Sequence, residues 1–149
     1  MKIKVLDLTR EYPRSPRERL GGYLHLPRMI DKARAKAAGT LGEYIYPCPL
    51  DQSLLEFTGI SGDAFYESVK ERDDQGILDW IKETAKNQNP KEIEEWNQGF
   101  LNRKPHNEES MRHFLEIRNK IAPHRTDVTT WVALLDLDEG REIPPNTHP

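Results

Sequence analysis

Apolar residues recur at helical spacing along most of this chain, and a proline or glycine ends each run after a few turns. The clearest run lies in residues 73–88, where Ile77, Trp80 and Ile81 would share one face of a helix while charged residues occupy the other. Helices this short bury their apolar faces by packing on one another, whereas a long coiled coil needs an uninterrupted pattern. The sequence therefore predicts an all-α fold, a compact single domain of about seven or eight short helices that spans residues 1–149.

Capping residues mark where the predicted helices begin, and glycine or proline marks where they end. Ser15–Glu18 reads SPRE, a capping box with proline at the first helical position, and predicts a short helix that stops at the glycine pair 21–22. A second helix is expected from Pro27 to Gly39. Further helices are expected within residues 50–59, 61–71, 73–88, 89–101, 107–122 and 127–140.

Three segments are expected to lie outside the helices. Residues 1–8, MKIKVLDL, alternate like a strand, but no second strand is evident in the sequence, so residues 1–14 should form an extended arm. The prolines in TLGEYIYPCPL predict a Pro-rich loop near residues 40–50. The Pro-rich end of the chain, residues 141–149, should be a non-helical tail.

The composition excludes several classes of protein. Cys48 is the single cysteine, so neither an internal disulfide nor a cysteine-based zinc site can form. No apolar run approaches the ~18–20 residues of a membrane-spanning helix, and Asp7, Arg10 and Glu11 stand where a signal peptide needs apolar residues. We expect a cytoplasmic protein with no membrane partner, no metal and no cofactor, and the sequence leaves its oligomeric state open.

Positive charge is concentrated at the start of the chain. Residues 1–39 hold ten Lys or Arg against four Asp or Glu, a net charge of +6, although the whole chain has a net charge of −3. In the helix expected from Pro27, the side chains of Arg28, Lys32 and Lys36 would form a basic ridge on the outer side. Water, or the acidic remainder of the chain, could satisfy this ridge.

Arg34 and Arg118 are the cations expected to point inward. Arg34 lies at the margin of the apolar face of its helix, and Arg118 falls inside an apolar stripe. That stripe consists of Met111, Phe114, Leu115 and Ile121. A buried guanidinium needs a partner, so each arginine could pair with a carboxylate and be structural, or line an open cavity and hold an anion. The carboxylates considered are Asp51, Asp136 and Asp138.

Asn97 is a second polar residue in an apolar stripe, because it lies between Ile93, Trp96 and Phe100 on one helix face. The functional interpretation is a pocket lined by Trp80, Trp96 and Asn97, in which Arg118 binds an anion bidentately. The structural interpretation is a satisfied polar group that fixes the order of the helices.

The loop of residues 43–51 gathers groups suited to acid–base chemistry. Tyr46 or Asp51 could act there as acid or base if its pKa were shifted, and Tyr44 lies nearby. Cys48 could be a nucleophile only with a base within reach, and none of the five histidines shows a recognisable pairing with it. We therefore interpret Cys48 as a small structural side chain.

Several strings in the sequence resemble a known family. They are YPRSPRERLGGYLHLPRMIDKARAKAAGTLGEYIYPCPLDQ at residues 12–52, followed by EFTGI, LDW, EEWN and LLDLDEGRE. In these strings, and over nearly its whole length, the chain resembles the bacterial family of domain of unknown function 5069 (DUF5069). The resemblance implies a stand-alone, soluble bacterial protein of about this length, and it implies no activity or catalytic residue.

The favoured function is a metal-free pocket that binds a small anionic metabolite, in a binding protein or an enzyme. The alternative is a protein–protein interaction module that acts as an adaptor. Nucleic-acid binding is least favoured, because the second helix of a possible helix-turn-helix, residues 62–71, has a net charge of −2. No catalytic residue is assigned. The candidate ligand-binding residues are Arg28, Arg34, Tyr44, Tyr46, Asp51, Trp80, Trp96, Asn97 and Arg118.

Overall fold

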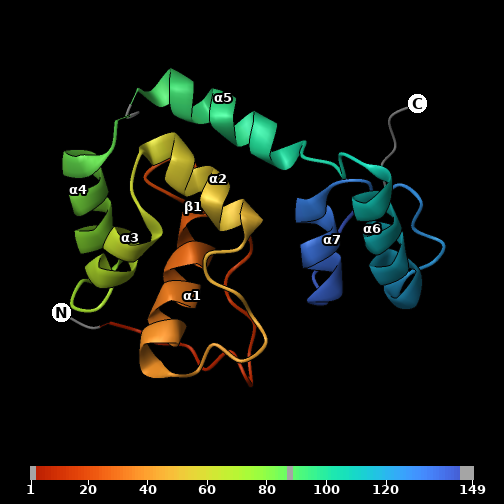
Figure 1. Ribbon diagram of the computed structural model, residues 1–149, viewed down its shortest axis with the longest axis horizontal. Coiled ribbons are helices and arrows are strands. Elements are labelled where there is room, and N and C mark those ends of the chain that lie inside the picture. Colours follow the sequence, from red (N-terminus) through yellow and green to blue (C-terminus); the bar gives the residue numbers. More distant parts are fainter. Residues whose placement is uncertain (1–2, 87–88, 145–149) are drawn as a thin grey trace. The chain divides into compact units, whose positions relative to one another are not determined.

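Helices make up most of the structure, a computed structural model that describes residues 3–86 and 89–144. Within those residues it contains seven helices and a two-stranded sheet (Figure 1). The elements are β1 (Arg19–Leu20), β2 (Tyr23–Leu24), α1 (Leu26–Ala38), α2 (Pro49–Thr58), α3 (Gly62–Ser68), α4 (Asp74–Thr84), α5 (Pro90–Leu101), α6 (Glu108–Ile121) and α7 (Trp131–Asp138). The predicted helical fold is confirmed, and the small sheet is an addition to it.

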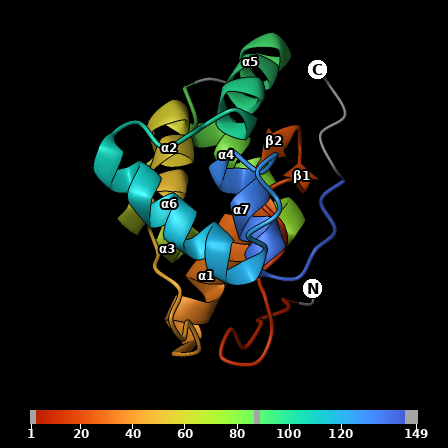
Figure 2. The same ribbon diagram turned by 90° about the vertical axis from the view of Figure 1, so that its right-hand side faces the viewer.

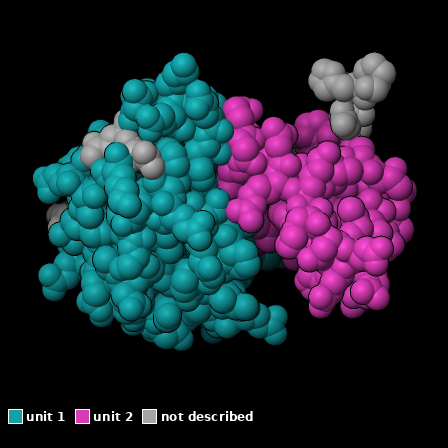
Figure 3. Space-filling model, turned by 45° about the horizontal axis from the view of Figure 1, so that its top comes forward, with its two compact units in different colours: residues 1–97 teal, residues 98–149 magenta. Residues whose placement is uncertain are grey.

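The chain divides into two compact units, Met1–Asn97 and Gln98–Pro149, which have different colours in Figure 3. Unit 1 contains the sheet and α1 to α4, unit 2 contains α6 and α7, and α5 crosses the boundary. That the chain is a single domain stays a prediction. Residues 1–2 of the predicted arm and 145–149 of the predicted tail lie outside the described residues, and residues 141–144 are not helical.

The segment around Ser15 forms a turn and a hairpin, so the short helix predicted there is wrong. The capping-box bond itself is present, because the Ser15 amide donates to a carboxylate oxygen of Glu18 at 3.1 Å. Gly21 and Gly22 then adopt φ values of +59° and +90°, as a two-residue hairpin turn requires. They connect β1 to β2, which pair antiparallel (Figure 2). Nucleating a helix is costly, and the glycine pair leaves too few residues to propagate one.

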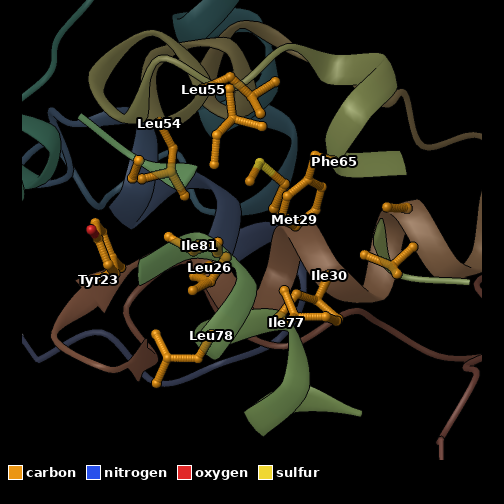
Figure 4. Packing of buried hydrophobic residues seen from close by; sticks show 14 of the residues in the cluster. Tyr23, Leu26, Met29, Ile30, Leu54, Leu55, Phe65, Ile77, Leu78 and Ile81 are labelled. Carbon is orange, nitrogen blue, oxygen red and sulfur yellow. The ribbon is translucent and has the colours of Figure 1, made fainter. Parts of the chain in front are cut away.

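Helix α1 is the centre of unit 1, and its predicted boundaries are confirmed. Pro27 lies in its first turn, and Gly39 ends it with a φ of +76°, a conformation that glycine adopts without strain. Side chains from the hairpin and from α1 to α4 meet in one core around it (Figure 4). Its members include Tyr23, Leu26, Met29, Ile30, Leu54, Leu55, Phe65, Ile77, Leu78 and Ile81. Burying each large apolar side chain contributes about 1.5–3 kcal/mol.

Two members of the basic ridge are buried, so the expectation that it faces outward is wrong for them. Arg28 and Lys32 are 2% and 3% exposed, whereas Lys36 is exposed. The arm covers this side of α1, because Leu8 packs against Ala35. A helix that is covered on most sides buries polar as well as apolar positions, so periodicity alone could not locate its exposed face.

Unit 2 has a core of its own. It consists of Phe114, Val128, Ala133 and Leu134, with Ile117 packed against it. The stripe predicted on α6 is corrected, because Met111 and Ile121 are 43% and 37% exposed. The buried face passes through Phe114 and Ile117, which moves Arg118 from its centre to its edge. Arg118 is half-buried and forms no ion pair with any described residue, and its guanidinium donates to the side chain of Asn119 at 3.4 Å. The carboxylate partner expected for it is therefore not found.

Candidate functional site

A pocket of about 430 Å³ lies in unit 1, where the arm passes α1 and the start of α4. Its volume falls within the ~300–1,000 Å³ that small-molecule sites occupy. Three of its residues are cationic and three are anionic, so its walls are more polar than those of most ligand sites. The lining consists of Lys4, Leu6, Arg14, Asp31, Arg34, Asp73, Asp74 and Gln75. Of the candidates named from the sequence, Arg34 lines this pocket.

A bidentate ion pair between Arg14 and Asp31 ties the arm to α1. The Nε and Nη2 atoms of Arg14 each lie 3.0 Å from a different carboxylate oxygen of Asp31, and the Arg14 amide donates to Asp31 Oδ2 at 2.8 Å. Nη1 of Arg14 donates to Oδ2 of Asp74, in the first turn of α4, at 2.8 Å. Burial opposes the charge of Arg14, yet the hydrogen bonds to both carboxylates raise its pKa. One guanidinium thus links three segments of unit 1.

Arg34 also meets a carboxylate, but it is none of the three considered from the sequence. Its Nη1 lies 3.0 Å from Oδ1 of Asp74, and its side chain is 4% exposed. Its Nη2 donates to the carbonyl of Arg72 at 3.0 Å, and Nη1 donates to the carbonyl of Lys4 at 3.5 Å. Neither Nε of Arg34 nor Oδ1 of Asp74 has a hydrogen bond to a described residue, although both atoms are buried. The contact between the two side chains is therefore an ion pair without hydrogen-bond alignment.

Lys4 and Asp73 are the pocket charges without a counter-ion among the described residues. The Lys4 side chain is exposed, and Asp73, in the same lining, is half-buried. Asp73 is the N-cap of α4, because its Oδ1 accepts a hydrogen bond from the Gly76 amide at 2.8 Å. Asp74 is different, because the hydrogen bond and charge of Arg14 hold its pKa below the usual range although burial opposes this.

A second group of charged side chains is buried between α1 and the start of α2. Asp51 lies at its centre, with Oδ1 2.6 Å from Nε2 of His25 and Oδ2 2.7 Å from Nζ of Lys32. The three residues are at most 3% exposed. Nζ of Lys32 also lies 3.2 Å from Sγ of Cys48, the N-cap of α2. His25 has a φ of +72°, a conformation that costs a non-glycine residue roughly 1–2 kcal/mol.

Burial and the neighbouring charges set the protonation states of this group. Burial alone would raise the pKa of Asp51, but the hydrogen bond from His25 and the charge of Lys32 hold it well below the usual range. Burial lowers the pKa of His25, so the ring is neutral at pH 7 and donates from Nε2 to Asp51. Burial, with a further contribution from Asp51, raises the pKa of Cys48. A protonated thiol is a weak nucleophile, so this group has the chemistry of a structural cluster.

Two tyrosines of the predicted loop are near α1. The guanidinium carbon of Arg28 lies 5.6 Å from the ring centre of Tyr44, and Arg28 donates to the carbonyl of Arg14 at 3.3 Å. Tyr46 is buried in the core of unit 1, where its hydroxyl donates to the carbonyl of Gly62 at 2.8 Å. Burial, followed by the charge of Asp51, raises the pKa of Tyr46. It is therefore protonated at neutral pH.

Asn97 is fully buried, as predicted, and it holds the hairpin. Its side-chain oxygen accepts from the Leu24 amide at 3.2 Å, and its amide nitrogen donates to the Gly22 carbonyl at 2.7 Å. Trp80 and Trp96 pack at the edge of the core of unit 1. Trp96 stacks on Phe57 with ring centres 5.5 Å apart, and the guanidinium carbon of Arg72 lies 5.8 Å from the ring centre of Trp80. Arg118 belongs to unit 2, and ligand binding by these residues stays a prediction.

Sequence reasoning missed most of the pocket and half of the buried cluster. The residues not among the candidates are Lys4, Leu6, Arg14, Asp31, Asp73, Asp74 and Gln75 in the pocket, and His25 and Lys32 in the cluster. Asp73 carried a usable signal, since an aspartate just before an apolar helical run is an N-cap. Arg14, Asp31, Asp74, His25 and Lys32 have partners 17 or more residues away in the sequence, which no local pattern reveals.

No helix in the described part of the chain is both long and apolar enough to cross a membrane. Within the same residues, no three His, Cys, Asp or Glu side chains converge as the ligands of a metal ion would.

Comparison with known proteins identifies a family. No curated protein matches the sequence. Residues 10–141 match the family described as Domain of unknown function (DUF5069). That range includes the buried cluster around Asp51 and every lining residue of the pocket except Lys4 and Leu6. The chain therefore belongs to the DUF5069 family.

Proposed function

We propose that the protein binds a small metabolite through a carboxylate or phosphate group, in the pocket between the arm, α1 and the start of α4. The observation that carries the proposal is Lys4, a residue that lines a cavity of about 430 Å³ and whose exposed ammonium group has no counter-ion among the described residues. An anionic group that contacts Lys4 forms an ion pair without breaking the pairs of Arg14 and Arg34.

The pocket is proposed to bind and orient its ligand. Arg14 and Asp74 hold one another in their charged forms, since the pKa of Arg14 is raised and that of Asp74 is lowered. Groups fixed in one protonation state can hold a charged ligand but transfer no proton near neutral pH.

Thermal unfolding tests this proposal. A ligand that binds only the folded protein raises its melting temperature, by an amount that corresponds to about 2.7 kcal/mol at a hundred times Kd. We expect at least one compound in a set of organic acids, nucleotides and inorganic phosphate to do so. The shift should disappear in Lys4→Gln and persist in Lys82→Gln, which removes an exposed cation in the last turn of α4. No shift with any compound, or an equal shift in both variants, would overturn the proposal.

A protein-interaction module is the alternative, and it rests on exposed apolar side chains. These are Val5, Tyr12, Ile45, Met111 and Ile121. They belong to three segments: the arm, the loop before α2, and α6. A stable complex or dimer in size-exclusion chromatography with light scattering would favour this alternative over the pocket.

A further inference from the structure

Most of the charged residues that line the pocket form ion pairs with one another, and one cation and one anion are left over. Arg14 satisfies both oxygens of Asp31 and one oxygen of Asp74, and Arg34 lies against the other oxygen of Asp74. Lys4 and Asp73 are left, each without an ion pair among the described residues.

Two atoms of the paired side chains also lack a hydrogen bond to a described residue. Among the described residues, Nε of Arg34 is a buried donor without a hydrogen bond, and Oδ1 of Asp74 is a buried acceptor that has only the ion pair with Arg34 at 3.0 Å. Buried polar groups are normally satisfied by protein, water or a ligand. A ligand that complements this pocket therefore presents both an acceptor and a donor.

The charge balance narrows the chemistry further. The six charged residues of the lining sum to zero, so a purely anionic ligand would give the pocket a net negative charge beside Asp73. A phosphate dianion would bring two negative charges to a single uncompensated cation. A carboxylate accompanied by an ammonium group matches Lys4 and Asp73 one to one and leaves the pocket neutral.

We propose that the pocket binds a small zwitterion that carries one carboxylate and one ammonium group, the class to which free α-amino acids belong. The carboxylate contacts Lys4, and the ammonium group contacts Asp73. A volume of about 430 Å³ is near the lower end for ligand sites, which suits a molecule of this size. This inference rests on the proposed function, because it names the class of ligand that the same pocket binds.

Isothermal titration calorimetry with matched probes tests the inference. The twenty common L-amino acids are screened first, and the tightest is compared with the carboxylic acid that lacks its amine and with the amine that lacks its carboxylate. We expect the amino acid to bind roughly tenfold or more tightly than either analogue, because each analogue loses a charge-assisted hydrogen bond.

Two conservative variants locate the two charges. Lys4→Gln should weaken binding of the amino acid, and Asp73→Asn should do the same, although asparagine is as good an N-cap as aspartate and α4 should stay intact. Lys82→Gln is the matched control and should bind like the unaltered protein. Thermal unfolding of each variant without ligand shows that the fold is retained.

The outcomes separate this inference from the proposed function. If the carboxylic acid without the amine binds as tightly as the amino acid, or if Asp73→Asn binds normally, the zwitterion is wrong while anion binding at the pocket stands. If neither the amino acids nor the anions of the thermal screen bind, both proposals are overturned.

Discussion

Asp51→Asn should strongly destabilise unit 1, because it removes the charge at the centre of a buried cluster and leaves its shape unchanged. In the folded protein Asp51 lies 2.7 Å from Nζ of Lys32 and 2.6 Å from Nε2 of His25. Asparagine keeps one oxygen for Lys32. Its amide group then faces His25, which must accept a hydrogen bond instead of donating one.

The size of the stability loss follows from the burial of Lys32. Two unit charges 2.7 Å apart attract by roughly 6 kcal/mol at an effective dielectric constant of ~20, and the cost of removing both from water offsets much of this. Removing one partner leaves the other ion buried and unpaired, which costs about 3–5 kcal/mol. Since Lys32 is 3% exposed, we expect a loss in this range, a large share of the ~5–15 kcal/mol typical of a folded protein.

Urea unfolding followed by circular dichroism at pH 7 measures the loss. Glu56→Gln is the matched control, an exposed carboxylate on the same helix, and should change the free energy of unfolding by less than about 0.5 kcal/mol. Combining Asp51→Asn with Lys32→Met should recover part of the loss, because no unpaired charge remains. A loss below about 1 kcal/mol for Asp51→Asn, or a double variant that loses the sum of both single changes, would refute the reasoning.

Three further results are expected. Stability should fall as the pH drops below ~6.5, because burial lowers the pKa of His25 and the unfolded chain therefore binds a proton more readily than the folded chain. The midpoints of urea unfolding at pH 7 and pH 5.5 check this, and equal midpoints would contradict it. Gly21→Ala should cost about 2–4 kcal/mol, because Gly21 has a φ of +59° and a Cβ there would clash with a methyl group of Leu78. Gly99→Ala is the control, because there is open space around Gly99, and it should be neutral or slightly stabilising. Cys48 should react with iodoacetamide at pH 7 more slowly than free cysteine, because burial raises the pKa of its thiol. Mass spectrometry measures the rate, and a reaction faster than that of free cysteine would mean that the Lys32 ammonium activates the thiol.

The helices could be predicted because their signals are local. The boundaries of α1 follow from Pro27 and Gly39, and the burial of Asn97 follows from its place in an apolar stripe. The hairpin was missed although its signal is also local. A glycine pair is a typical signal for a two-residue hairpin turn. The capping box at Ser15 and Glu18 is a signal for a helix in the same segment, and the prediction followed the helix signal.

Most of the pocket could not be predicted, because ion-pair partners follow from tertiary contacts that no local pattern encodes. Arg34 was placed correctly at an inward position, yet its carboxylate is Asp74, 40 residues away and not among those considered. Arg118 shows the opposite error, since a shift of the buried face of α6 by one position moves it to the edge of the core. Lys32 was assigned to the surface because its partner Asp51 comes from another helix.

Mapping where a ligand binds is the most direct test of binding at the pocket. Two-dimensional ¹H–¹⁵N NMR spectra of the labelled protein would be recorded during titration with the compound that gives the largest thermal shift. We expect the amide signals that change most to belong to residues 4–14, 31–34 and 73–76, which line or flank the pocket. Changes centred on the buried cluster at Cys48 and Asp51, or on unit 2, would contradict binding at this site.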